Sequence, residues 1–142
     1  MSISYFPKDD HPMSRVQLAL NVPDLDEAVD FYSRLFAVEP AKQRPGYANF
    51  VVADPPLKLV LFEAPDSTDR LNHLGVEVAD PAAVRDHQAR LSDDGITTTE
   101  GSGTCCFAEQ EKVWIDAPDG PWEIYAVLAD SETFAGAGTC CS

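Results

Sequence analysis

Apolar positions along the chain follow first the period of a strand and then that of a helix. The run from Arg15 to Val22 is rich in aliphatic residues and stops at Pro23, which is typical of a buried strand. Asp24 then precedes a segment whose apolar residues recur at helical spacing to about residue 37, with Glu27 placed as in a capping box. Three short β-like runs follow, at about residues 39–44, 47–53 and 57–63.

The same β-α-β-β-β order begins again 56 residues later. NHLGVEVAD, residues 72–80, aligns with VQLALNVPD, residues 16–24, and this alignment pairs Gln17 with His73 and the helix cap Asp24 with Asp80. A second helix is expected from about Pro81 to Asp94, ahead of strands at about residues 96–100, 105–108, 112–116 and 122–127. The pattern predicts an α+β fold made of two tandem βαβββ modules.

Length and charge limit the class of protein. The 142 residues suit one domain, expected at 13–128, with module one at 14–63, a linker at 64–71 and module two at 72–128; residues 1–12 form an N-terminal arm and 129–142 a flexible Cys-containing tail. A net charge of −14 argues against nucleic-acid and membrane-surface partners. The chain lacks an apolar run of about 18 residues or a signal-peptide pattern, so we expect a cytoplasmic protein without a disulfide framework.

Three segments carry a resemblance to a known superfamily. QLALNVPDLDEAVDFYSRLF, HLGVEV and DAPDGPWEIY, in this order and spacing, resemble the vicinal-oxygen-chelate superfamily, which includes glyoxalases, bleomycin-resistance proteins and extradiol dioxygenases. The resemblance covers residues 14–128 and implies that each module curls its sheet into half of a cup. It also implies a metal held by inward-facing residues of the first and last strand of each module, here Gln17, a position near Lys58, His73 and Glu123.

The donor types at these positions restrict the metal. A protonated Lys58 cannot ligate, which leaves the amide oxygen of Gln17, the imidazole of His73 and the carboxylate of Glu123. A His and carboxylate set with open positions suits non-haem Fe(II). Gln17 departs from the His that iron-dependent members carry there, and this weaker ligand lets Ni, Co, Mn or Zn occupy the site in vitro.

Two further side chains leave alternatives open around this site. His11, in the arm, is a rival ligand. Tyr125 shares a strand face with Glu123, so it lies either beside the metal or in the core.

All four cysteines stand in two adjacent pairs, in GTCCF at 103–107 and GTCCS at 138–142. Consecutive strand residues point to opposite faces, so Cys105 and Cys106 address one ligand only from a loop or bulge. Two thiolates at one point select a thiophilic atom such as As(III), Cd, Hg or Cu(I). The alternative is that both cysteines pack as small apolar residues beside Phe107.

A closer resemblance favours the first alternative. KLVLFE, TCCF and KVWIDAPDG, together with the segments above, are similar to the organoarsenical C–As lyase family and to the related cadmium-induced proteins. This implies an Fe(II)-dependent dioxygenase that uses O2 to cleave the carbon–arsenic bond of a small trivalent organoarsenical, with Cys105 and Cys106 binding arsenic and Gln17, His73 and Glu123 binding the metal. We expect a monomer or a homodimer.

Other functions remain open from the sequence. The same fold and thiols would serve a non-catalytic protein that sequesters cadmium or arsenite, and a third alternative is a glyoxalase-type isomerase or thiol transferase. Cys140 and Cys141 would deliver arsenic, supply a third thiol or act as a simple thiol trap.

Overall fold

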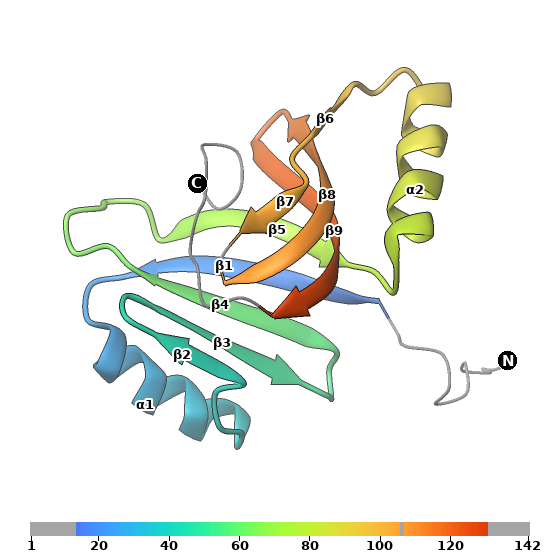
Figure 1. Cartoon of the computed structure of the whole chain (residues 1–142). Helices are drawn as coiled ribbons and strands as arrows, with labels where there is room; N and C mark the ends of the chain where they lie inside the picture. Colours follow the sequence, from blue (N-terminus) through green and yellow to red (C-terminus); the bar gives the residue numbers. More distant parts are fainter. Residues whose placement is uncertain (1–13, 106, 131–142) are drawn as a thin grey trace, which may run out of the picture.

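A computed structural model describes residues 14–105 and 107–130 of the chain (Figure 1). The predicted arm with His11, the second member of the first cysteine pair, Cys106, and residues 131–142 with Cys140 and Cys141 lie outside the described residues. Within the described part, neither helix combines the length and apolar character needed to cross a membrane.

The described residues form two helices and one mixed sheet of nine strands. Module one contains β1 (Arg15–Val22), α1 (Leu25–Phe36), β2 (Lys42–Arg44), β3 (Tyr47–Val52) and β4 (Leu57–Glu63). Module two contains β5 (Leu71–Glu77), α2 (Pro81–Asp93), β6 (Thr98–Glu100), β7 (Gly103–Cys105), β8 (Ala108–Ala117) and β9 (Gly120–Asp130). The predicted α+β fold with two tandem modules is confirmed.

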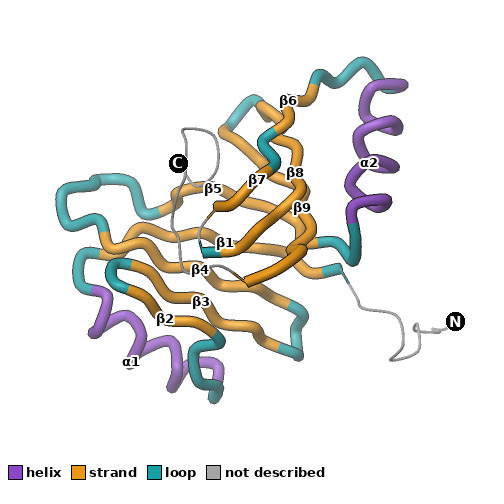
Figure 2. Tube along the Cα trace, in the orientation of Figure 1, coloured by secondary structure: helices purple, strands orange, loops and turns teal. Residues whose placement is uncertain are grey.

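The two modules meet at the centre of the sheet. Its strand order is β2-β3-β4-β1-β5-β9-β8-β6, with β7 also paired to β8. The first strand of each module runs parallel to the last strand of the same module, β1 to β4 and β5 to β9, and β1 and β5 are antiparallel neighbours. The curved sheet has α1 against β3 and β4, and α2 against β8 and β9 (Figures 1 and 2).

Both helices begin at the residues that the sequence predicts. The side chain of Asp24 accepts a hydrogen bond from the backbone N–H of Glu27 at 3.1 Å, and Asp80 accepts one from Ala83 at 2.9 Å. These bonds satisfy N–H groups that have no partner inside the helix. The two helices, which are equivalent under the 56-residue repeat, therefore begin with the same kind of capping hydrogen bond.

The helix-covered face of the sheet contains the apolar core. In module one, Leu20, Leu25, Phe50 and Leu61 belong to a buried cluster, and a separate cluster around Val84 and Ile124 fills module two. Because successive strand residues face opposite sides, the other face of the central strands is left for a different set of side chains.

The strand predicted at residues 105–108 is wrong. The chain turns there instead, with Phe107 at a φ of 65° and with Cys105 paired across the turn to Ala108. β6 and β7 both pair with β8, as two pieces of one strand interrupted at Gly101 and Ser102. A Cβ at position 101 would lie 3.0 Å from the Trp114 ring, so any residue larger than glycine at this interruption would need the ring to shift. The split gives module two four strands after its helix, one more than the βαβββ order contains.

Candidate functional site

Strand register aligns the predicted site residues in one row across the sheet. Lys58 of β4, Gln17 of β1, Gly75 of β5 and Glu123 of β9 are successive Cα partners. His73 lies two residues from Gly75 on β5, so its side chain shares their face. The row explains how residues more than one hundred positions apart in sequence meet at a single point.

Gly75 leaves the gap in which these side chains meet. A Cβ at this position would lie 2.9 Å from Cγ of Glu123 and 3.1 Å from Nε2 of Gln17. Contacts this short force a neighbour to move. The missing side chain therefore lets Gln17 and Glu123 approach each other across the intervening strand.

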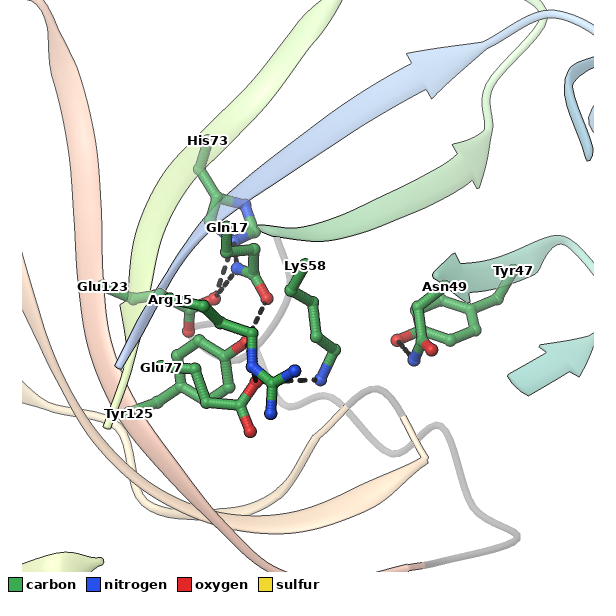
Figure 3. A network of polar contacts seen from close by, with 9 residues as sticks. All are labelled: Arg15, Gln17, Tyr47, Asn49, Lys58, His73, Glu77, Glu123 and Tyr125. Carbon is green, nitrogen blue, oxygen red and sulfur yellow. Dashed lines mark hydrogen bonds and ion pairs between the residues drawn. The ribbon is translucent and has the colours of Figure 1, made fainter. Parts of the chain in front are cut away.

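The three predicted metal ligands are brought together, as Figure 3 shows. Nε2 of Gln17 donates to Oε2 of Glu123 at 2.6 Å and lies 3.2 Å from Nε2 of His73. Nε2 of His73 lies 2.8 Å from the same carboxylate oxygen. All three residues are buried, with exposed fractions of 3–4%. The position near Lys58 in the same row does not supply a donor to this group.

A lysine that the sequence analysis did not single out compensates the buried carboxylate. Nζ of Lys112 lies 2.7 Å from Oε1 of Glu123, and the lysine side chain is 1% exposed. Burial acts to raise the pKa of Glu123, but the hydrogen bond with His73 and the charge of Lys112 outweigh it, so the pKa lies below its ordinary value. Glu123 is therefore a carboxylate in the folded protein.

A second polar row, formed by Arg15, Lys58, Glu77 and Tyr125, lies beside the first and ends at the Gln17 amide. Oε1 of Glu77 is 3.4 Å from Nε of Arg15, 3.6 Å from Nζ of Lys58 and 3.4 Å from the hydroxyl of Tyr125. That hydroxyl also donates to Oε1 of Gln17 at 2.5 Å. Tyr125 thus lies beside the predicted ligands and is buried as well, so both alternatives in the sequence analysis describe it.

Burial changes the acidity of two members of this second row. It lowers the pKa of Lys58, an effect that the charge of Glu77 partly offsets. It raises the pKa of Tyr125 well above its ordinary value, helped by the charges of Glu77 and Glu123. Tyr125 is therefore a neutral hydrogen-bond donor. The buried surroundings of Lys58 disfavour its charged form.

A cavity of about 200 Å³ opens onto these groups. Lys58, Val60 and Phe62 all line it, which confirms that the three share a face of β4. Lys112 and Ala108 of β8 line it as well. The cavity lies between the two modules, as expected of the two halves of a cup.

The donor set fits a divalent cation, with Gln17 as a necessary member. Within residues 14–105 and 107–130, no group of three or more His, Cys, Asp or Glu side chains is placed to hold a metal ion. Oε2 of Glu123 only accepts, so at 2.8 Å Nε2 of His73 either donates a proton to it or shares a cation with it. Gln17 presents its NH2 group here rather than the expected oxygen, and half a turn of the amide would exchange the two atoms.

The turn that follows Cys105 is anchored to module one. The backbone oxygen of Phe107 accepts a hydrogen bond from Nζ of Lys42 at 2.7 Å, and its buried ring lies 5.2 Å from that of Tyr47. Ala108, the Cα partner of Cys105, lines the cavity. Cys105 therefore ends β7 opposite a strand residue that lines the cavity, and its role in binding stays a prediction.

Comparison with known proteins finds one superfamily and close relatives within it. A family model described as the glyoxalase/bleomycin resistance protein/dioxygenase superfamily matches residues 14–122. The chain is 62% identical over 124 residues to the cadmium-induced protein CadI of Mycobacterium tuberculosis, an alignment that covers 86% of this chain and 82% of that protein. It is 55% identical over 135 residues to a trivalent organoarsenical cleaving enzyme of Thermomonospora curvata, covering 92% and 89%.

Solved structures of low sequence identity share the fold. The Mn(II)-bound glyoxalase from Novosphingobium aromaticivorans superposes with a TM-score of 0.59 at 18% identity, covering 89% of this chain and 44% of that one. This likeness shows the fold alone. Together the comparisons confirm the resemblance to the superfamily and to its organoarsenical and cadmium-related branch.

Gly75→Ala should lower the free energy of unfolding by about 1–3 kcal/mol, because the added methyl group overpacks the row. Urea denaturation measures this cost. In a Glu123→Ala background the same substitution should cost less, since the nearest contact atom is gone. An equal cost in both backgrounds would contradict the steric explanation.

Lys58→Met should raise the free energy of unfolding at pH 7 by about 1 kcal/mol or more, because it removes a poorly solvated ammonium while Arg15 still pairs with Glu77. The folded chain releases the Lys58 proton at a lower pH than the unfolded chain, so wild-type stability rises with pH in that window. The advantage of the variant should therefore shrink as pH approaches about 10.5.

Denaturation curves from pH 7 to 10 test this, with Arg34→Met at an exposed ion pair as the control. A variant that is less stable than wild type at every pH would show instead that the pair with Glu77 is net stabilising.

Proposed function

Because the chain belongs to the glyoxalase/bleomycin resistance protein/dioxygenase superfamily, we propose that it is a non-haem Fe(II)-dependent dioxygenase that cleaves the carbon–arsenic bond of trivalent organoarsenicals. The product is arsenite, and the biological role is arsenic detoxification. The observation that carries the proposal is 55% identity, over 92% of the chain, to a relative named for this cleavage. The buried meeting of Gln17, His73 and Glu123 beside a cavity supports it.

His73 and Glu123 hold the iron in this proposal, and Gln17 completes the set through its amide oxygen. Fe(II) supplies there the redox chemistry that lets O2 react with an organic substrate. Tyr125 accommodates either orientation of the amide: its hydroxyl donates to Oε1 of Gln17 at 2.5 Å, or it accepts from Nε2 and donates toward Glu77. The protein groups around the ligands thus let Gln17 change partners without leaving a buried atom unpaired.

Cys105 and Cys106 bind the substrate in this proposal. A trivalent organoarsenical carries two hydroxyl groups, which two thiols replace with loss of two water molecules. The arsenic is then fixed by two bonds while its organic substituent stays free to enter the cavity. Fixing the reacting bond beside the metal removes most of the entropy cost of bringing it to O2.

Cadmium or arsenite sequestration is the second candidate function. The 62% identity to the cadmium-induced protein CadI favours it. So does the ion pair between Lys112 and Glu123, because a divalent cation has to compete with an ammonium group 2.7 Å from its carboxylate ligand. In this alternative the thiols bind the soft ion and no bond is cleaved.

Turnover distinguishes the two functions. Protein loaded with Fe(II) under anaerobic conditions should release arsenite from methylarsenite or phenylarsenite only when O2 is admitted, with matching O2 uptake. Glu123→Gln should lower kcat/KM by at least about 100-fold, because it removes a proposed metal ligand. Glu109→Gln, at an exposed carboxylate on β8, is the matched control and should keep wild-type activity.

The cysteine pairs supply their own comparison. Cys105→Ser/Cys106→Ser should abolish cleavage at micromolar substrate, whereas Cys140→Ser/Cys141→Ser tests whether the second pair has any part in it. Cleavage that persists without Cys105 and Cys106 would refute their role in binding. Stoichiometric binding of arsenite or cadmium with no cleavage would favour sequestration.

A further inference from the structure

A chain of amide hydrogen bonds leads from the linker between the modules to His73. Nδ2 of Asn21 donates to the backbone oxygen of Asp69 at 3.0 Å. Nδ2 of Asn72 donates to Oδ1 of Asn21 at 3.0 Å, and Oδ1 of Asn72 lies 2.8 Å from Nδ1 of His73. Neither asparagine was singled out by the sequence.

The first contact fixes the direction of every bond in this chain. A backbone oxygen only accepts, so Asn21 must present its NH2 group to Asp69 and its oxygen to Asn72. Asn72 must then donate to Asn21, which turns its own oxygen toward His73. Nδ1 of His73 therefore carries a proton and donates it to Asn72.

The consequence lies at the other ring nitrogen. With Nδ1 committed to Asn72, the ring presents Nε2 to Gln17 and Glu123, at 3.2 and 2.8 Å. Nε2 is then the nitrogen left for a cation. An outer hydrogen bond of this kind sets both the orientation and the basicity of a ligating imidazole.

A β-bulge places Asn72 where it can do this. Ala19 of β1 pairs with His73 and Leu20 pairs with Leu71, so Asn72 has no Cα partner in β1. A bulge changes the direction in which a strand side chain points. Without it, Asn72 and His73 would face opposite sides of the sheet, and their side chains would not meet.

The repeat makes this support reciprocal between the modules. Residues 21 and 77 are equivalent under the 56-residue offset. Asn21 of module one reaches His73 of module two through Asn72. Glu77 of module two reaches Gln17 of module one through the Tyr125 hydroxyl, at 3.4 and 2.5 Å. Each module therefore supports the proposed ligand of the other.

We propose that Asn72, held by Asn21, is a positioning residue that orients His73 so that Nε2 faces the cation. The inference rests on the proposed metal site and adds to it the two asparagines. It predicts that cation affinity depends on an acceptor at position 72, beyond any effect of that position on stability.

Two substitutions at position 72 separate orientation from folding. Asn72→Ala and Asn72→Asp both lose the donor to Asn21, so both should lower the melting temperature of the metal-free protein to a similar extent. Only Asn72→Asp keeps an acceptor for Nδ1 of His73. Asn72→Ala should therefore weaken cation binding by about 10- to 100-fold, while Asn72→Asp stays much closer to wild type.

Mn(II) is the probe, because it prefers nitrogen and oxygen donors over the thiols of the chain. The electron paramagnetic resonance signal of free Mn(II) measures the affinity without turnover. Asn49→Ala is the matched control: Asn49 is a buried asparagine in the same cavity, but it donates to the hydroxyl of Tyr47 at 2.9 Å and should leave Mn(II) affinity unchanged.

The outcomes distinguish this inference from the function on which it rests. Equal Mn(II) affinity in wild type and both Asn72 variants would overturn the positioning role and leave the metal site in place. An equal loss in Asn72→Ala and Asn72→Asp would also overturn it, because the acceptor would then be irrelevant. A wild-type protein that does not bind Mn(II) would overturn the metal site itself and this inference with it.

Discussion

Burial of the Glu123 carboxylate is the constraint around which the concave face of the sheet is organised. A charged group that loses its water needs opposite charge and hydrogen bonds of comparable strength. Lys112, His73 and Gln17 supply them within 2.8 Å or less of a carboxylate oxygen. This is why a polar group lies on one face of the central strands, beside a small apolar cluster, although the opposite face carries the main apolar core against the helices.

The same contacts determine how a cation can bind to the Glu123 carboxylate. In the described protein the carboxylate is satisfied by an ammonium group and by hydrogen-bond donors, so a divalent cation would enter by replacing contacts rather than by filling an empty acidic cluster. Such a site favours reversible over very tight binding. A neutral amide among the proposed ligands acts in the same direction, because it adds no negative charge to the set.

Much of the fold could be predicted from the sequence, because local residue patterns determine where its helices and strands form. Helix caps and strand periods depend on neighbouring residues. The 56-residue repeat paired Gln17 with His73, and the resemblance to the superfamily added Glu123 to them. Lys112 and Asn72 could not be found in this way. Their roles depend on strand register and on a bulge, which arise only when distant strands pair. Lys112 follows Glu109, Gln110 and Glu111 in β8, so its neighbours in the sequence do not mark it as a buried residue.

The reciprocal support at residues 21 and 77 makes the site a property of the junction between the modules. A module separated from its partner would keep its own ligand but lose the groups that hold that ligand in place. The two halves of the chain are thus held together by these polar contacts as well as by the β1–β5 pairing. An insertion or a circular permutation that weakened the contacts between the modules would disrupt the proposed metal site before it unfolded either module.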